Sequence, residues 1–289
     1  LRALYDLPAP AKINRFLHVV GRRDDGYHLL QSVFVLIDWC DTLHFERRED
    51  GLLARHDLGP ALPADDLCLR AARALQTQST SAFGADISID KRLPSGAGLG
   101  GGSSDAATTL LALNRLWGLG WSRHRLQALA ATIGADVPFF VGGDNAFVEG
   151  IGDRLTPLML EPERFVVAKP AASIGTADIF ASPHLKRDTP AVILEGFLAS
   201  AGQPVSIDCE FGRNDLQPIA EACCPQVQAA AQWLQARFGN ARMSGSGSAV
   251  FARVGSDERF TWQAGEVPAG WVVRMCHSLD QHPLKGWAG

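Results

Sequence analysis

A run of glycines near the middle of the chain constrains its fold more than any other feature of the sequence. Residues 94–104 contain five glycines within seven positions, and glycine allows conformations and close approaches that a Cβ would prevent. Residues 85–93 alternate apolar and polar side chains, which predicts a half-exposed strand, and residues 105–117 have helical apolar spacing. A strand, a glycine loop and a helix in this order predict a concave row of backbone N–H donors at a helix N-terminus. Phosphate is the anion that we expect there.

Three interpretations of this loop compete. A flexible linker is the first, although linkers rarely lie tightly between a strand and a helix. A dinucleotide-binding turn is the second, because Gly96, Gly98 and Gly101 match its spacing. That fold needs a continuous apolar strand before the loop and an acidic residue about 20 positions later, whereas this strand alternates and Trp121 occupies that position. A cradle for a nucleoside triphosphate agrees best, although no lysine follows the glycines as in a Walker A loop.

The composition limits the kinds of partner. The chain has 289 residues, 46% of them hydrophobic, which suffices for one large or two modest domains. A net charge of −4 without a long basic run argues against nucleic acid or an anionic membrane as the main partner. The six cysteines form no C-x-x-C pair and the eight histidines show no metal-ligand spacing, so we expect reduced thiols and no structural zinc.

Targeting signals are also absent from the printed sequence. It contains no signal peptide and no apolar run of membrane length, so we expect a soluble protein of the cytoplasm. Because the first residue is Leu1 instead of methionine, we expect that the chain was trimmed or processed.

The first half of the chain predicts an α+β fold. Residues 9–48 are rich in short strands, and Asp65 and Asp66 are expected to open a helix before the glycine loop. Ser122 is expected to cap a further helix that ends near Gly134. Strands, a helix, a strand and two helices in succession are typical of mixed or antiparallel sheets covered by helices.

The pattern breaks near residues 150–157, and we predict a domain boundary there. The expected domains span residues 1–156 and 157–289. The expected elements of the second domain are strands over 164–169, 248–254 and 271–276, and helices from Thr176, over 191–201 and over 225–238.

Two charged residues lie in unusual places. Lys12 stands between apolar neighbours in an expected strand, so its ammonium either reaches solvent or meets an anion. Asn14, two residues later, would lie on the same face. Asp136 is either a turn residue or a functional carboxylate. We expect Pro138 to bias it away from helical dihedral angles, and Phe139 to exclude water behind it.

Five segments together resemble the GHMP kinases, the superfamily of galactokinase, homoserine kinase and mevalonate kinase. Residues 94–105 resemble the phosphate-binding motif of the superfamily, and residues 242–248 resemble its C-terminal glycine motif. The latter reads Ser-Gly-Ser-Gly-Ser where Ser-Gly-Thr-Gly-Ala or similar is expected. Residues 10–14, 23–28 and 134–140 are similar to segments of those members that phosphorylate a cytidine-diphosphate-linked alcohol in isoprenoid precursor synthesis.

The resemblance implies a two-domain fold with mixed and antiparallel sheets, helices and an active site in the cleft between the domains. It implies an ATP-dependent small-molecule kinase that uses Mg²⁺, with Lys12 and Asp136 as the catalytic pair. It assigns ATP binding to Pro94, Ser95, Gly96, Ala97, Gly98, Leu99, Gly100, Gly101, Gly102, Ser103 and Ser104. No metal ligand is assigned. Lys91 and Arg92 are candidate helpers, and Ser104 is either a Mg²⁺ contact or a helix cap.

The resemblance also implies a substrate with a cytidine diphosphate moiety. Tyr27 would stack on the cytosine, His28 would recognise its edge and Phe180 would oppose it. Thr176 and Asn14 would contact the substrate. From the residues alone, Tyr27 and Phe180 could equally be packing residues, and Thr176 a helix cap.

Two other functions remain open at this point. Another small-molecule kinase of the superfamily, of homoserine or mevalonate type, would share the loop. A catalytically inactive ATP-binding sensor would share the fold, although the presence of both Lys12 and Asp136 argues against it. The oligomeric state is not readable from the sequence.

Overall fold

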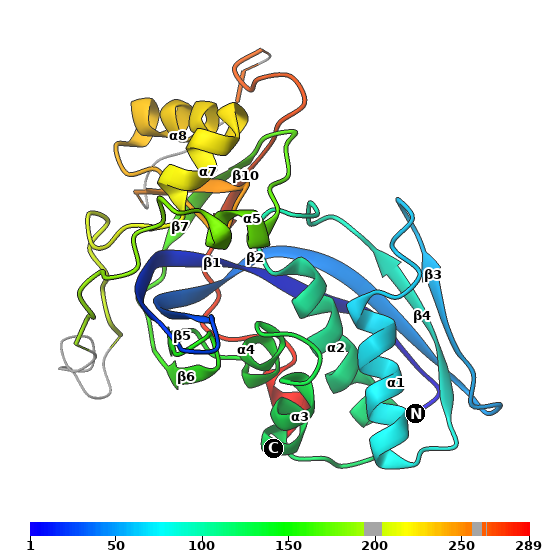
Figure 1. The fold of residues 1–289 in the computed structure, drawn as a ribbon. Helices are drawn as coiled ribbons and strands as arrows, with labels where there is room; N and C mark the ends of the chain where they lie inside the picture. Colours follow the sequence, from blue (N-terminus) through cyan, green and yellow to red (C-terminus); the bar gives the residue numbers. More distant parts are fainter. Residues whose placement is uncertain (194–203, 256–261, 264) are drawn as a thin grey trace.

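A computed structural model describes residues 1–193, 204–255, 262–263 and 265–289 (Figure 1). Its first sheet is built around two long antiparallel strands that run through the middle of the molecule. The strands pair in the order β3-β4-β2-β5-β6, with β1 also on β2. They are β1 (Ala3–Arg22), β2 (His28–Arg48), β3 (Leu53–Asp57), β4 (Gly84–Asp90), β5 (Ala146–Glu149) and β6 (Arg154–Pro157).

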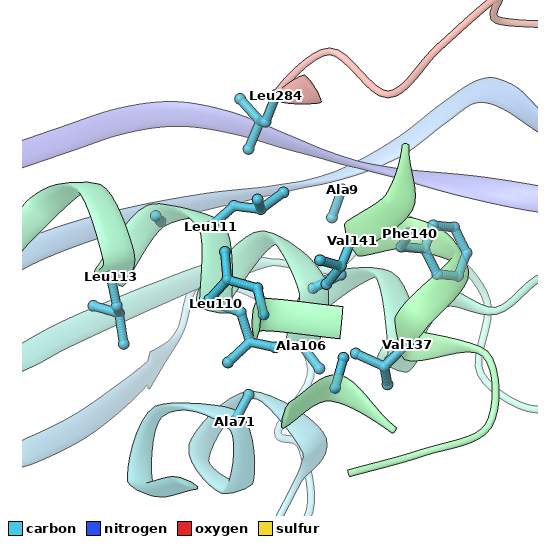
Figure 2. Close-up of a cluster of buried hydrophobic side chains, with 14 of the residues drawn as sticks. Ala9, Ala71, Ala106, Leu110, Leu111, Leu113, Val137, Phe140, Val141 and Leu284 are labelled. Carbon is cyan, nitrogen blue, oxygen red and sulfur yellow. The ribbon is translucent and has the colours of Figure 1, made fainter. Parts of the chain in front are cut away.

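Four helices cover one face of this sheet. They are α1 (Leu67–Ser79), α2 (Gly101–Leu116), α3 (Arg123–Ala130) and α4 (Val137–Gly142). The central helix α2 is buried along most of its length, and Leu110 and Leu111 pack with Phe140 and Val141 of α4 (Figure 2). This apolar core fixes the start of α2 relative to the start of α4, which places the two helix N-termini near the long strands.

The second sheet has four strands in the order β10-β7-β9-β8. Alternate residues of β7 face opposite sides: Phe165 and Val167 pack toward the first sheet, whereas Val166 and Ala168 pack toward helices. The result is four layers, with a helical layer outside each sheet. The strands of this sheet are β7 (Arg164–Lys169), β8 (Arg242–Met243), β9 (Val250–Val254) and β10 (Val272–His277). The remaining described helices of the chain are α5 (Thr176–Ala181), α7 (Gln217–Cys223), α8 (Pro225–Phe238) and the short η1 (Lys285–Trp287).

The end of the chain returns to the first sheet. The N–H of Leu279 donates to the carbonyl of Leu36 at 2.8 Å, and Leu284 belongs to the same apolar core as Leu110 and Leu111 (Figure 2). Residues 278–289 therefore pack with elements of the first half, and the C-terminus lies beside α3 (Figure 1). The division into 1–156 and 157–289 remains a prediction.

The α+β class is confirmed, and so are the start of a helix at Asp66 and the helix cap at Ser122. The expectation of short strands over residues 9–48 is wrong. They form two strands of 20 and 21 residues, because register shifts along the β1–β2 pair absorb the breaks in the apolar pattern. The helix expected over 191–201 lies mostly outside the described residues. Among the described helices, none is long and apolar enough to cross a membrane.

Candidate active site

A cleft of about 730 Å³ opens where the two sheets meet the start of α2. Its walls come from segments far apart in the sequence: the middle of β1, the glycine loop, the start of α4, the beginning of α5 and residues 245–247. Every residue predicted to bind ATP lines it except Ser104. Lys12, Asn14, Asp136, Thr176 and Phe180 line it as well.

The glycine loop has a shape that only glycine allows at two positions. Gly98 has φ +72°, and a Cβ there would lie 2.2 Å from the carbonyl oxygen of Ser244. Gly100 also has φ +72°, and a Cβ there would lie 2.9 Å from the Phe140 ring. The backbone is thus pressed against its neighbours, which is inconsistent with a flexible linker.

Helix α2 begins at Gly101, four residues earlier than the sequence predicted, and Gly100 is its N-cap without a side-chain hydrogen bond. The usual signal, a Ser or Asp side chain, is absent because glycine occupies the cap. The first N–H groups of α2, at Gly101, Gly102 and Ser103, therefore have no partner within the helix. They point to an anion site at the edge of the cleft.

Backbone hydrogen bonds fix this loop to the second glycine segment, residues 244–248. The N–H groups of Ser248 and Ala249 donate to the carbonyls of Gly96 and Ala97 at 3.2 and 3.0 Å. The Ser244 hydroxyl donates to the Gly98 carbonyl at 3.0 Å. Residues 244–248 are therefore more than a local turn, since these bonds hold the glycine loop in place.

Lys12 and Asp136 lie together in the cleft. The Lys12 ammonium donates to Asn14 Oδ1 at 2.7 Å and lies 3.5 Å from Asp136 Oδ2. Lys12 is 3% exposed and its nitrogen lies 4.3 Å from the centre of the Phe34 ring, so it does not reach bulk solvent. A buried ammonium needs an opposite charge, and Asp136 provides one from the opposite wall.

The strand and the loop position Lys12 through the backbone. Its N–H donates to the carbonyl of Leu99 at 2.9 Å, which ties the middle of β1 to the glycine loop. Asn14 lies on the same face, as predicted, and its amide donates to the Ser32 hydroxyl at 2.9 Å. Its amide oxygen is thereby turned toward the Lys12 ammonium.

Asp136 is the residue before α4 and makes no capping bond to that helix. The expectation that Pro138 keeps it out of the helical region is wrong, since Asp136 has φ −86° and ψ −12°. Proline restricts the residue directly before it, which is Val137. The carboxylate is left available to the cleft because the buried Phe139 and Phe140 anchor α4 behind it.

The suggestion that Lys91 and Arg92 assist phosphate binding is not supported by their partners. Lys91 forms ion pairs with Asp41 and with Asp105, the latter at 2.6 Å, and Arg92 pairs with Asp90 at the surface. Burial lowers the pKa of Lys91 but the two carboxylates outweigh it, so its pKa is raised. Burial raises the pKa of Asp105 to about 7. The Lys91 ammonium is thus already paired with two carboxylates of the protein.

Ser104 does not cap α2, because it lies inside the first turn of the helix. It is fully buried, and its hydroxyl is among the buried polar atoms of the described residues that have no hydrogen-bond partner. Of the two roles predicted for it, the helix cap is therefore wrong. Among the described residues, no group of three His, Cys, Asp or Glu side chains could hold a metal ion.

A second cavity of about 610 Å³ adjoins the cleft and shares Thr176 and Phe180 with it. Tyr27 and His28 line it, and Tyr27 is 60% exposed. The His28 and Phe180 rings contact each other with centres 5.0 Å apart and planes 34° apart. The structure thus brings together the three residues that were expected to form a base pocket.

Thr176 is the first residue of α5, and the cap position belongs to Gly175. The predicted alternative that Thr176 caps this helix is therefore wrong. Its hydroxyl lies 2.7 Å from the hydroxyl of Ser246 at the rim of the cleft. Ser246 was not singled out in the sequence, where it is one serine among several in a glycine-rich segment.

Comparisons with known sequences identify the family of this chain. The model of the GHMP kinases N terminal domain matches residues 66–144, and that of the GHMP kinases C terminal domain matches residues 192–260. A 4-diphosphocytidyl-2-C-methyl-D-erythritol kinase of Methylibium petroleiphilum is 63% identical over 100% of this chain and 99% of its own length. The chain belongs to the 4-diphosphocytidyl-2-C-methyl-D-erythritol kinases, within the GHMP kinases. A kinase of the same name from Polaromonas naphthalenivorans is 54% identical, over 99% of this chain and 97% of that protein.

Solved structures agree with the fold of this kinase family. A crystal structure of a 4-(cytidine 5'-diphospho)-2C-methyl-D-erythritol kinase matches with a TM-score of 0.71 and 37% identity, over 85% of this chain and 88% of that one. A homoserine kinase from Cytophaga hutchinsonii has a TM-score of 0.65 at 14% identity, covering 98% and 96% of the two chains. At that identity the likeness shows the fold alone, so it gives no support to a homoserine kinase.

Proposed function

We propose that this kinase transfers the γ-phosphoryl group of ATP to the 2-hydroxyl of 4-diphosphocytidyl-2-C-methyl-D-erythritol, in non-mevalonate isoprenoid precursor synthesis. The observation that carries the proposal is the 3.5 Å approach of Lys12 and Asp136 in the cleft lined by the glycine loop. The substrate is the one named in the relatives at 54–63% identity over almost the whole chain.

The chemistry that we assign to the pair follows from charge. The Asp136 carboxylate accepts a hydrogen bond from the substrate hydroxyl and aligns it for attack. The Lys12 ammonium balances the negative charge on the phosphoryl oxygens during transfer. Because phosphoryl transfer passes through a loose transition state, alignment of the hydroxyl contributes more than early removal of its proton. Asn14 holds the Lys12 ammonium at its place by accepting its hydrogen bond.

The loop residues 94–104 fit a triphosphate. The unpaired N–H groups at the start of α2 and the close-packed glycine backbone form a concave donor surface, and no described cation lies in the loop itself. We propose that Mg²⁺ enters with the triphosphate and supplies the missing positive charge. Residues 101–103 would contact the phosphates, while no protein ligand of the metal is assigned.

The second cavity fits the cytidine end of the substrate. Tyr27 offers an exposed aromatic face and Phe180 a second one, and base stacking is worth about 1–3 kcal/mol without regard to sequence. We therefore assign the choice of base to His28, and contacts along the diphosphate to Thr176. From the net charge of −4 we further propose that nucleic acid is not a partner, and we propose a location in the cytoplasm.

The test is an activity assay on the purified chain with ATP, Mg²⁺ and one alcohol at a time. The alcohols are 4-diphosphocytidyl-2-C-methyl-D-erythritol, mevalonate and homoserine, with ADP release and the ³¹P spectrum of the product as readouts. We expect ADP release only with the first alcohol, and one new phosphomonoester signal. Equal or greater turnover of mevalonate or homoserine would overturn the substrate, and no ADP release with any alcohol would favour the inactive sensor.

A further inference from the structure

His28 is held by a residue that takes no part in the catalytic pair. The Arg187 Nε–H donates to His28 Nε2 at 2.9 Å, although the two residues are 159 positions apart in the sequence. The other nitrogens of the same guanidinium donate to the carbonyls of Phe180, Ser182 and Leu185 at 2.8–3.1 Å. Arg187 thus bonds both the His28 ring and the backbone of Phe180, the two residues whose rings contact each other in the base cavity.

This contact determines which ring nitrogen carries the proton. A guanidinium has only N–H donors, so its partner, His28 Nε2, must be an acceptor without a proton. In a neutral imidazole the proton then lies on Nδ1. Burial, Arg187 and Arg22 all lower the pKa of His28, which keeps the ring neutral at pH 7. Within the described residues no hydrogen bond is made to Nδ1, so its N–H is available to a ligand of the cavity.

The available N–H distinguishes between the two pyrimidine bases. Cytosine has an unprotonated N3 that accepts a hydrogen bond, whereas uracil carries a proton at N3 and would oppose one donor with another. The two bases stack equally well on Tyr27 and Phe180, because stacking depends on the aromatic faces. A hydrogen-bond donor of fixed position is therefore what the cavity needs to select cytosine.

We propose that Arg187 is a positioning residue that sets the base preference of this cavity by fixing the proton of His28 on Nδ1. The inference rests on the proposed function, in that it takes the cavity of Tyr27, His28 and Phe180 to be the cytidine site. It adds a residue and a mechanism of selection that the catalytic pair does not require.

The first test is spectroscopic and leaves Arg187 unchanged. The full chain is labelled with ¹⁵N-histidine, and long-range ¹H–¹⁵N correlation at pH 7.5 identifies the protonated nitrogen of each ring, with His28→Gln to assign the signal. We expect the His28 signal of a neutral ring protonated at Nδ1. A signal of the Nε2-protonated form would overturn the inference whatever the variants do.

The second test compares Arg187→Met with Arg187→Lys by titration calorimetry with CDP and UDP. Both variants lose the bonds to the backbone carbonyls, but only lysine keeps a charged donor for His28 Nε2. An unpaired or opposed polar group costs about five- to a hundredfold in affinity, so we expect the wild type to prefer CDP by about tenfold or more. We expect Arg187→Lys to keep this ratio and Arg187→Met to reduce it below about threefold, with the His28 signal changed.

The contrary outcomes separate the two proposals. If both variants weaken CDP and UDP binding by the same factor and leave the ratio and the His28 signal unchanged, Arg187 is only structural and the inference is wrong. If the wild-type chain binds neither nucleotide, the cytidine site of the proposed function is wrong, and this inference falls with it.

Discussion

The contact between the two glycine segments predicts a large effect of one methyl group. Replacing Gly98 by alanine would place a Cβ 2.2 Å from the Ser244 carbonyl oxygen and 3.0 Å from the backbone nitrogen of Gly247. Both neighbours are backbone atoms, which cannot rotate away as a side chain would. Gly98→Ala therefore forces the glycine loop away from residues 244–248.

The expected loss of unfolding free energy follows from the strain at residue 98 and from the hydrogen bonds that this separation weakens. A positive φ of +72° costs alanine about 1–2 kcal/mol relative to glycine. Separation also weakens the three hydrogen bonds between the segments, each worth about 0.5–1.5 kcal/mol. We expect Gly98→Ala to lower the free energy of unfolding by about 3–5 kcal/mol.

Gly102→Ala is the matched control four residues later. The added Cβ would meet only Leu67 Cδ1 at 3.7 Å, and the residue lies in α2, where alanine is favoured over glycine by about 0.5–1 kcal/mol. Both variants are measured by urea unfolding followed by circular dichroism, without nucleotide. If Gly98→Ala unfolds within about 1 kcal/mol of the wild type, or no more easily than Gly102→Ala, the close contact described above does not exist.

Three further predictions concern stability and reactivity. Because burial raises the pKa of Asp105 to about 7, the folded chain between about pH 4 and pH 7 holds a proton that the unfolded chain has released. The stability that this proton contributes is present below about pH 4 and is lost as the pH rises through 7. We expect Asp105→Asn to flatten the decline of unfolding free energy between pH 5 and pH 8 by about 1–3 kcal/mol, and an unchanged decline would refute this. Cys223 is exposed, whereas burial raises the pKa of Cys68 and that of Cys276, so a thiol reagent at pH 8 should label Cys223 first, which peptide mass spectrometry would check. Ser122→Ala should cost about 1 kcal/mol of unfolding free energy by loss of the α3 cap, and no loss would show that the cap is not formed in solution.

The features that depend on residues close together in the sequence, namely the glycine loop and the helix starts, could be predicted from the sequence. The glycine loop between a strand and a helix is recognisable because positive φ angles and close backbone contacts require glycine. The caps at Asp66 and Ser122 are recognisable because their side chains bond N–H groups three residues later. The start of α2 was misplaced for the same reason, since Gly100 caps it without any side chain.

Contacts between distant segments could not be predicted in this way. Lys91 pairs with Asp41, and Arg187 with His28, because whole layers pack together. Neither the residue types nor their spacing in the sequence predicts these contacts. Lys12 and Asp136 were selected partly through resemblance to a family. The sequence alone left each of them with an ordinary alternative, as a solvated lysine and as a turn residue.

The claim that Asp136 prepares the alcohol for phosphoryl transfer is tested most directly by kcat of Asp136→Asn. The change removes the charge 3.5 Å from Lys12 and keeps the shape of the side chain. Asp280→Asn is the control, because Asp280 is exposed and outside the residues that line the cleft. We expect kcat with ATP and the cytidine-linked alcohol to fall by about 10²- to 10⁴-fold in Asp136→Asn, with an unchanged affinity for a non-hydrolysable ATP analogue. A kcat equal to that of Asp280→Asn would contradict the mechanism.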